Sequence, residues 1–187
     1  MTRMIWWRER ATVSAEKPVE TTASIHPSAE LFQPIIMVKP GMIIIGEKSR
    51  IDSFVKLEGG QGLEIGRYVH VASFAHIGIG GGETTLEDYS AVASGGKIIS
   101  GSNQIYAVSM SAIAPPDMQR VKTFKTVLRR FAVVLTNAVV LPGIILGEGA
   151  VLAAGAVATR DIPDWQIWSG VPAKFLMIRP HDQEMVK

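Results

Sequence analysis

Histidine is the side chain best suited to exchange protons near neutral pH, and the chain has four of them. His70 and His76 lie six residues apart in the middle of the chain, whereas His26 and His181 lie in its end segments. The chain contains no cysteine, which excludes disulfides, thiolate metal ligands and a cysteine nucleophile. His70 and His76 are therefore the two candidate general bases in the body of the chain.

A group of cations lies in residues 120–130, which read R-V-K-T-F-K-T-V-L-R-R and hold five positive charges with no negative one. This stretch could steer a pyrophosphate-bearing ligand, or it could be a solvated face of a loop. Nucleic acid is a poor match, because this stretch has few aromatic side chains for base stacking. The formal net charge of +2 is also too small to argue for it.

The elements that must position these residues are predicted by a repeat of six. From residue 134 the chain reads V-L-T-N-A-V, V-L-P-G-I-I, L-G-E-G-A-V, L-A-A-G-A-V, A-T-R-D-I-P. Every block opens on an apolar residue and has Ala or Ile as its fifth residue, a period that neither an α-helix nor a simple exposed strand explains. Three earlier runs have the same spacing: Ile45, Ile51, Leu57; Ile65, Val71, Ile77; and Leu86, Val92, Ile98.

Such a repeat predicts a triangular solenoid in an all-β chain. Each block is a short strand followed by a corner, and three blocks close one coil. The residue that opens each block points inward and stacks on its equivalent one coil away, roughly 4.8 Å along the axis. Each coil contacts only its neighbours, so the two ends need caps.

The pattern also predicts the domain organisation. Residues 1–30 lack hexads and are expected to form an N-terminal cap, and residues 31–171 form the β-helix. The hexads stop near residues 101–131, where Pro115 and Pro116 forbid a continuous helix or strand, so we expect a long excursion that contacts the acceptor substrate. Residues 172–187 are expected to form a tail with a short helix after Pro172.

Composition limits the location of the protein. The longest apolar stretches run to about ten residues, far short of the roughly 20 that a membrane-spanning helix needs. The first residues, M-T-R-M-I-W-W-R, lack the apolar core and cleavage site of a signal peptide. We therefore expect a cytoplasmic protein.

The run L-P-G-I-I-L-G-E-G-A-V-L-A-A-G-A-V-A-T-R-D-I-P and, shortly after it, S-G-V-P-A-K-F-L resemble the hexapeptide-repeat acetyltransferases that act on maltose, galactosides, xenobiotics and polysaccharide sugars. The stretch G-R-Y-V-H-V-A-S-F-A-H-I with the later I-I-S-G-S-N is most similar to members associated with polysaccharide synthesis. The resemblance covers residues 45–180. It implies a left-handed parallel β-helix, a homotrimer, and a coenzyme A (CoA) groove between two subunits.

The resemblance also implies a set of residues that bind acetyl-CoA. Ala154 would offer backbone contacts to the pantetheine arm. Thr159 and Arg160 occupy the family's Thr-Lys or Thr-Arg position beside the adenosine. Lys174, in P-A-K, matches a basic position that meets the CoA phosphates. No metal is expected.

Acyl transfer needs a general base for the acceptor and a donor for the developing oxyanion. Many sugar acetyltransferases carry the base in the loop after the middle hexads, but residues 100–106 contain no histidine. His70 falls where sugar N-acetyltransferases of this fold often carry an active-site histidine, and His76 is the alternative. Asp88 could orient a histidine across a coil, and Asn103 could bind the acceptor or donate to the oxyanion.

The leading hypothesis is an acetyl-CoA-dependent transfer to a hydroxyl or amine of a sugar or nucleotide-linked sugar, in surface polysaccharide synthesis. The missing loop histidine favours a second hypothesis, a non-catalytic CoA-binding protein or scaffold. A third is a metal lyase, because γ-type carbonic anhydrases use this fold with three histidines on zinc. The coils hold only His70 and His76, and their spacing of six differs from that family's five.

Overall fold

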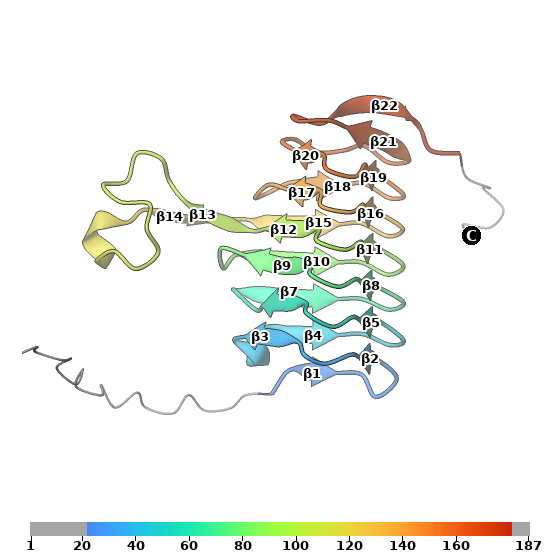
Figure 1. Ribbon diagram of the computed structural model, residues 1–187, viewed down its shortest axis with the longest axis horizontal. Helices are drawn as coiled ribbons and strands as arrows, with labels where there is room; N and C mark the ends of the chain where they lie inside the picture. Colours follow the sequence, from blue (N-terminus) through green and yellow to red (C-terminus); the bar gives the residue numbers. More distant parts are fainter. Residues whose placement is uncertain (1–21, 181–187) are drawn as a thin grey trace, which may run out of the picture.

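The computed structural model describes residues 22–180 and shows triangular coils stacked along one axis (Figure 1). Three parallel sheets form the faces of the solenoid, and each complete coil contributes one strand to each face. The result is a left-handed β-helix of about seven turns, which confirms the solenoid predicted from the hexads and the handedness that the resemblance implied. His181 and most of the expected N-terminal cap lie outside the described residues.

The strands are short, and those of the first six coils rotate through the three faces in the same order. Sheet A contains β1 (Ser24–Ile25), β4 (Ile43–Ile45), β7 (Gly62–Ile65), β10 (Glu83–Leu86), β15 (Lys125–Leu128) and β18 (Ile145–Leu146). Sheet B contains β2 (Glu30–Leu31), β5 (Arg50–Ile51), β8 (His70–Val71), β11 (Ala91–Val92), β16 (Val133–Val134), β19 (Val151–Leu152), β21 (Gln166–Ser169) and β22 (Lys174–Ile178). Sheet C contains β3 (Ile36–Val38), β6 (Lys56–Glu58), β9 (His76–Ile79), β12 (Lys97–Ile99), β17 (Val139–Val140) and β20 (Val157–Ala158). The first coil holds β1–β3, the second β4–β6, the third β7–β9, the fourth β10–β12, the fifth β15–β17 and the sixth β18–β20.

The core is the stack of residues that open the hexads. All fourteen of these predicted positions are at most 1% exposed: Ile45, Ile51, Leu57, Ile65, Val71, Ile77, Leu86, Val92, Ile98, Val134, Val140, Leu146, Leu152 and Ala158. Their neighbours along each strand point outward, because successive side chains of a strand lie on opposite faces. The fifth residue of a hexad is buried as well, as at Ala138, Ala150 and Ala156, so each hexad supplies the core with its opening residue and its compact fifth residue.

The coils differ in length between the two halves of the solenoid. Arg50 pairs with His70 across one coil, a spacing of 20 residues, whereas Val133 pairs with Val151, a spacing of 18 residues. The additional residues lie in the glycine-rich turns between sheets C and A, where the hexads break. The parallel strands keep their register except at a shift between Ile98 and Ile99, where β12 pairs with β9, so the outward side chains before it still align from coil to coil.

The corner between sheets A and B carries a ladder of aromatic rings. The rings of Tyr68, Tyr89 and Phe131 stack with centroids 5.2 and 5.3 Å apart. The Trp165 ring follows at 6.2 Å from Phe131. It reaches across the sixth coil, which has Gly149 at this corner. A Cβ at that position would lie only 2.4 Å from the indole ring, so the glycine leaves the space that the ring occupies. These contacts stabilise residues held at positive φ.

The expected excursion leaves the solenoid after the fourth coil and projects to one side of it (Figure 1). It begins with an antiparallel pair, β13 (Gly101–Asn103) and β14 (Val121–Thr123), and also holds a 3-10 turn at Pro116–Met118. The chain is back in sheet A at β15, earlier than the expected end near residue 131. A second 3-10 turn, Pro40–Met42, precedes β4. No helix within residues 22–180 is long and apolar enough to cross a bilayer.

Both ends of the solenoid differ from the expectation. Strands β1 and β2 pair with β4 and β5, so the first coil starts before residue 31. At the other end, the expected helix after Pro172 is wrong for Lys174–Ile178, which form β22 antiparallel to β21. The free edge of β21 offers unpaired backbone groups, and an apolar segment satisfies them better as a strand than as a helix.

Candidate active site

His70 lies on the outer surface of sheet B, while its neighbour Val71 points into the core. The imidazole Nε2 lies 3.0 Å from Oδ2 of Asp52, which comes from the preceding coil. The other oxygen of Asp52 accepts a hydrogen bond from Nε of Arg50 at 2.7 Å. The His70 side chain is 49% exposed, so a ligand can reach it.

His76 repeats this arrangement on sheet C. Its Nε2 lies 2.7 Å from Oε1 of Glu58, and Nζ of Lys56 lies 2.8 Å from the same oxygen. The His76 side chain is less exposed, at 26%. The two histidine–carboxylate pairs thus lie on either side of the corner between sheets B and C.

The electrostatics of these pairs favour the tautomer that a general base needs. Burial alone would raise the pKa of Asp52, but hydrogen bonds from Arg50 and His70 hold that pKa below its ordinary value. Burial alone would also raise the pKa of Glu58, but hydrogen bonds from Lys56 and His76 hold that pKa below its ordinary value. Because an ionised carboxylate only accepts, a neutral imidazole beside it carries its proton on Nε2 and leaves the lone pair of Nδ1 to take a proton.

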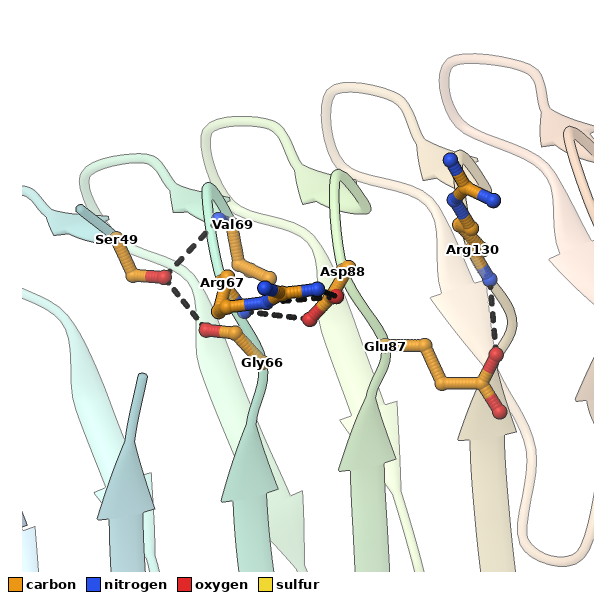
Figure 2. A network of polar contacts seen from close by, with 7 residues as sticks. All are labelled: Ser49, Gly66, Arg67, Val69, Glu87, Asp88 and Arg130. Carbon is orange, nitrogen blue, oxygen red and sulfur yellow. Dashed lines mark hydrogen bonds and ion pairs between the residues drawn. The ribbon is translucent and has the colours of Figure 1, made fainter. Parts of the chain in front are cut away.

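Within residues 22–180 of one chain, Asp88 pairs with Arg67 and with no histidine, so the prediction that it orients a histidine across a coil is wrong there. Its Oδ2 accepts hydrogen bonds from Nε and Nη2 of Arg67 at 3.0 and 2.7 Å, and its Oδ1 accepts from the Arg67 backbone N–H at 2.7 Å (Figure 2). Arg67 therefore holds the pKa of Asp88 below its ordinary value, against the effect of burial. A carboxylate so stabilised is a weak base.

The role of Asp88 recurs three coils later, which identifies it as part of the corner. Asp164 accepts a hydrogen bond from the backbone N–H of Glu148 at 2.8 Å, as Asp88 does from Arg67. In each case a glycine precedes the donor, and a Cβ there would lie 2.6 or 2.3 Å from the aspartate oxygen. Asp88 therefore caps a turn, and the carboxylates that contact His70 and His76 belong to Asp52 and Glu58.

The four residues expected to bind CoA gather at the C-terminal end of the solenoid. Ala154 lies in the turn after β19, and Thr159 and Arg160 directly follow β20. The segment before Lys174 lies against β20, because Val157 donates a backbone hydrogen bond to Gly170 and accepts one from Ala173. All four are exposed: Ala154, Thr159, Arg160 and Lys174.

Arg160 has an aromatic partner that the sequence did not indicate. Its guanidinium carbon lies 5.5 Å from the ring centroid of Trp168 in β21. Trp168 in turn donates from Nε1 to Gln166 at 2.8 Å. A guanidinium held over an aromatic ring keeps its N–H groups available for a phosphate.

The corner between sheets B and C, called the B–C corner, connects this end to the histidines. One residue from each coil occupies it, in the order Phe54, Phe74, Gly95, Asn137 and Gly155. The two phenyl rings stack with centroids 5.3 Å apart and are 57% and 65% exposed. Beyond them the corner holds Gly95, Asn137 and Gly155, all smaller than a phenylalanine, between the third coil and the C-terminal end.

Asn103 lies in the excursion, apart from His70. It ends β13 in the excursion, where its Nδ2 donates to the carbonyl of Met110 at 3.1 Å. Its Oδ1 is buried and has no hydrogen-bond partner among residues 22–180. The excursion extends away from the side that carries β8 (Figure 1), so Asn103 and His70 of one chain do not meet.

The basic stretch of residues 120–130 is dispersed in the structure. Its five cations have different surroundings: Arg120 and Lys122 lie in the excursion, Lys125 pairs with Glu83, Arg129 pairs with Glu87, and the Arg130 guanidinium lies over Phe131. The stretch therefore does not form one continuous basic surface.

The sequence reasoning missed Asp52, Glu58 and Trp168. The first two could have been found from the coil length, since each acid lies 18 residues before its histidine and the coils here have about 20 residues. Across residues 22–180, no three side chains of the metal-binding kinds come together to hold an ion.

No protein-family description and no curated protein sequence matches the chain. Solved structures do match. AntD, an N-acyltransferase from Bacillus cereus in complex with dTDP and 3-hydroxybutyryl-CoA, is 25% identical with a TM-score of 0.80, over 89% of this chain and 87% of AntD. A hexapeptide-repeat acetyltransferase from Vibrio cholerae, VCA0836, complexed with acetyl-CoA, is 18% identical with a TM-score of 0.59, over 87% and 74%.

The fold is that of the hexapeptide-repeat acyltransferases. A variant of AntD with dTDP-4-amino-4,6-dideoxyglucose and CoA matches at 25% identity and a TM-score of 0.80, over 89% of both chains. These neighbours confirm the resemblance predicted from the C-terminal hexads. They are acyltransferases crystallised with CoA or an acyl-CoA, as the sequence led us to expect.

Proposed function

We propose that the protein transfers an acyl group from a CoA thioester to an amine or hydroxyl of a nucleotide-linked sugar. One observation carries this proposal. The B–C corner runs from His70, which Asp52 orients, to the C-terminal end of the solenoid, where Arg160 and Lys174 are exposed. Strands β8 and β19 are three coils apart, roughly 14 Å along the axis. That span is comparable with the reach of an extended pantetheine arm.

The residues at the C-terminal end have complementary roles in this proposal. The exposed turn at Ala154 offers backbone groups to the amides of pantetheine, at a point where Gly155 leaves space. Thr159 and Arg160 lie beside the adenosine, and Lys174 binds its phosphates. Charge-assisted contacts of this kind are among the strongest hydrogen bonds available to a surface site.

The proposed chemistry uses His70 as the general base. Nδ1 of His70 removes a proton from the acceptor as its nitrogen or oxygen attacks the thioester carbonyl, and the resulting imidazolium returns that proton to the departing CoA thiolate. Asp52 holds the ring in the required tautomer throughout. Asn103 of a second copy donates its amide N–H to the oxyanion, which is why we also propose a homotrimer.

The finer assignments rest on the sequence resemblance and on AntD. We propose an acceptor of the kind used in surface polysaccharide synthesis and a cytoplasmic reaction. AntD was crystallised with an amino sugar carried on dTDP, which favours an amine as the acceptor.

The first test is a calorimetric titration of the purified protein with CoA and acetyl-CoA. The double variant Arg160→Ala, Lys174→Ala should bind CoA at least about tenfold more weakly, because it loses two charge-assisted contacts. A matched control, Arg120→Ala with Lys122→Ala, removes the same charge from the excursion and should bind like the wild type.

Two outcomes would overturn the proposal in different ways. If the wild type does not bind CoA at millimolar concentration, the site at the C-terminal end does not exist. If it binds CoA tightly but transfers no acyl group to any amino or hydroxy sugar nucleotide, the protein is a CoA-binding scaffold.

A further inference from the structure

The outer face of sheet A carries two adjoining cavities outside the B–C corner. One is about 290 Å³ and is lined by residues of β4, β7, β10 and β15, and the other is about 280 Å³ and continues towards the A–B corner. Glu64 and Thr85 line both of them. Together the cavities, called the sheet A groove, have the size of a small-molecule site.

Glu64 is the unpaired carboxylate of this groove. Three other acidic side chains line the groove, and each forms an ion pair: Glu83 with Lys125, Glu87 with Arg129 and Asp88 with Arg67. Within residues 22–180, no cation lies within ion-pair distance of Glu64. Its neighbours along the outward row of sheet A are Ile44 and Thr85, which carry no charge.

Arg130 is the matching cation at the other end of the groove. Its guanidinium carbon lies 4.5 Å from the Phe131 centroid and 5.6 Å from that of Tyr89. Its backbone N–H, not its side chain, donates to Glu87 (Figure 2). No carboxylate of residues 22–180 forms an ion pair with the Arg130 side chain, so its N–H groups remain available to an anion.

The third coil relates this groove to the histidines. Glu64, His70 and His76 are the outward residues of β7, β8 and β9, one on each face of the same coil. If copies of the chain assemble around an axis parallel to the solenoid, these three residues lie at one level in every copy. A ligand on sheet A of one chain then lies level with the histidines of the next.

We infer that the sheet A groove binds the acceptor, with Glu64 holding its amine and Arg130 holding its diphosphate. This inference rests on the proposed function and adds the acceptor site to it. Glu64 binds the ammonium form by a charge-assisted hydrogen bond and positions it. The ammonium releases one proton to solvent to give the attacking amine, and the second proton, lost on attack, passes through the histidine to the CoA thiolate. The groove selects a ligand that carries both a positive and a negative group.

The test uses dTDP-4-amino-4,6-dideoxyglucose and dTDP as probes in calorimetric titrations of the full chain. Glu64→Gln should weaken binding of the amino sugar nucleotide about tenfold and leave dTDP unchanged, because only the former has the amine. Arg130→Gln should weaken both about tenfold. Glu148→Gln and Arg120→Ala, which change the same charges elsewhere, should bind both probes like the wild type.

Titration of the same variants with CoA separates this inference from the proposed function, because CoA also carries a diphosphate. We expect CoA to bind Glu64→Gln and Arg130→Gln as it binds the wild type. If Arg130→Gln loses CoA but keeps dTDP, the groove belongs to the acyl donor and the inference is wrong. It is also wrong if the wild type binds CoA but neither nucleotide, or if both variants, with unchanged melting temperature, bind the amino sugar nucleotide normally.

Discussion

The third and sixth coils have the same interior and opposite surfaces. Their inward residues are Ile65, Val71 and Ile77 in one and Leu146, Leu152 and Ala158 in the other, all at most 1% exposed. Their outward residues, matched through the strand register, are Glu64, His70 and His76 in the third coil and Ile145, Val151 and Val157 in the sixth.

This difference shows how the solenoid separates stability from chemistry. Because strand residues alternate between core and surface, a titratable group can replace an aliphatic one outside without changing the stack inside. The apolar surface of the sixth coil suits the pantetheine arm that we propose there, and the charged third coil suits proton transfer. The two coils can therefore be tested with matched substitutions.

The largest effect is expected on catalytic activity, from substitutions of the outward residues. His70→Ala should lower kcat for acyl transfer about 100- to 10,000-fold, because a positioned base is lost. Val151→Ala, its register equivalent, should change kcat by less than about threefold, since it removes no group that exchanges protons. Steady-state kinetics at saturating acetyl-CoA measure both, and an active His70→Ala with an inactive His76→Ala would move the base to sheet C.

At the inward positions the two coils should behave alike. Ile77→Ala and Leu152→Ala each remove most of a fully buried side chain, and each should lower the free energy of unfolding by about 2–5 kcal/mol. Thermal melting followed by circular dichroism would measure this. Unequal losses, with only one coil sensitive, would show that the interiors are not equivalent after all.

The difference between inward and outward residues also explains which parts of the structure the sequence predicts. The inward residues repeat every six positions, so the hexads predicted the fold and the buried set directly. The Asp52–His70 pair was not predictable from local spacing, because it joins residues 18 apart and depends on coils lengthened by turns between sheets C and A. Asp88 was misassigned for a related reason: an acid near a corner looks alike in sequence whether it caps a backbone N–H or orients a histidine.

The C-terminal strand β22 shows another limit. Its residues were expected to form a helix, but their conformation is decided by β21, whose open edge is a property of the assembled solenoid. The sequence carries no local signal for such an edge. Capping elements are therefore the least predictable part of a repeat fold.

The corners should respond less strongly than the core, and the two corners of the sixth coil should differ. Gly149→Ala should cost about 3 kcal/mol, because a Cβ at positive φ would also collide with the Trp165 ring. Gly155→Ala should cost about 1 kcal/mol, because its φ is similar but nothing lies within 4 Å of the added Cβ. Denaturant unfolding of both variants tests this, and equal losses would mean that Trp165 moves aside freely.

The smallest effect is expected at Asp88, and it should depend on pH. Since Arg67 lowers the pKa of Asp88 in the folded protein, the carboxylate stabilises the fold above its unfolded pKa of about 3.8, and this contribution disappears as the pH falls through the lower folded value. Asp88→Asn should therefore cost about 1 kcal/mol at pH 7, and the difference from the wild type should shrink below about pH 4. Asp164→Asn replaces the equivalent turn-capping carboxylate by an amide whose oxygen can still accept the backbone N–H. Among residues 22–180 Asp164 forms no ion pair, so this variant serves as the matched control. Unfolding measured from pH 3 to pH 7 would reveal the difference, and a loss for Asp88→Asn that does not vary with pH would mean that the cap alone, and not the Arg67 pair, stabilises this corner.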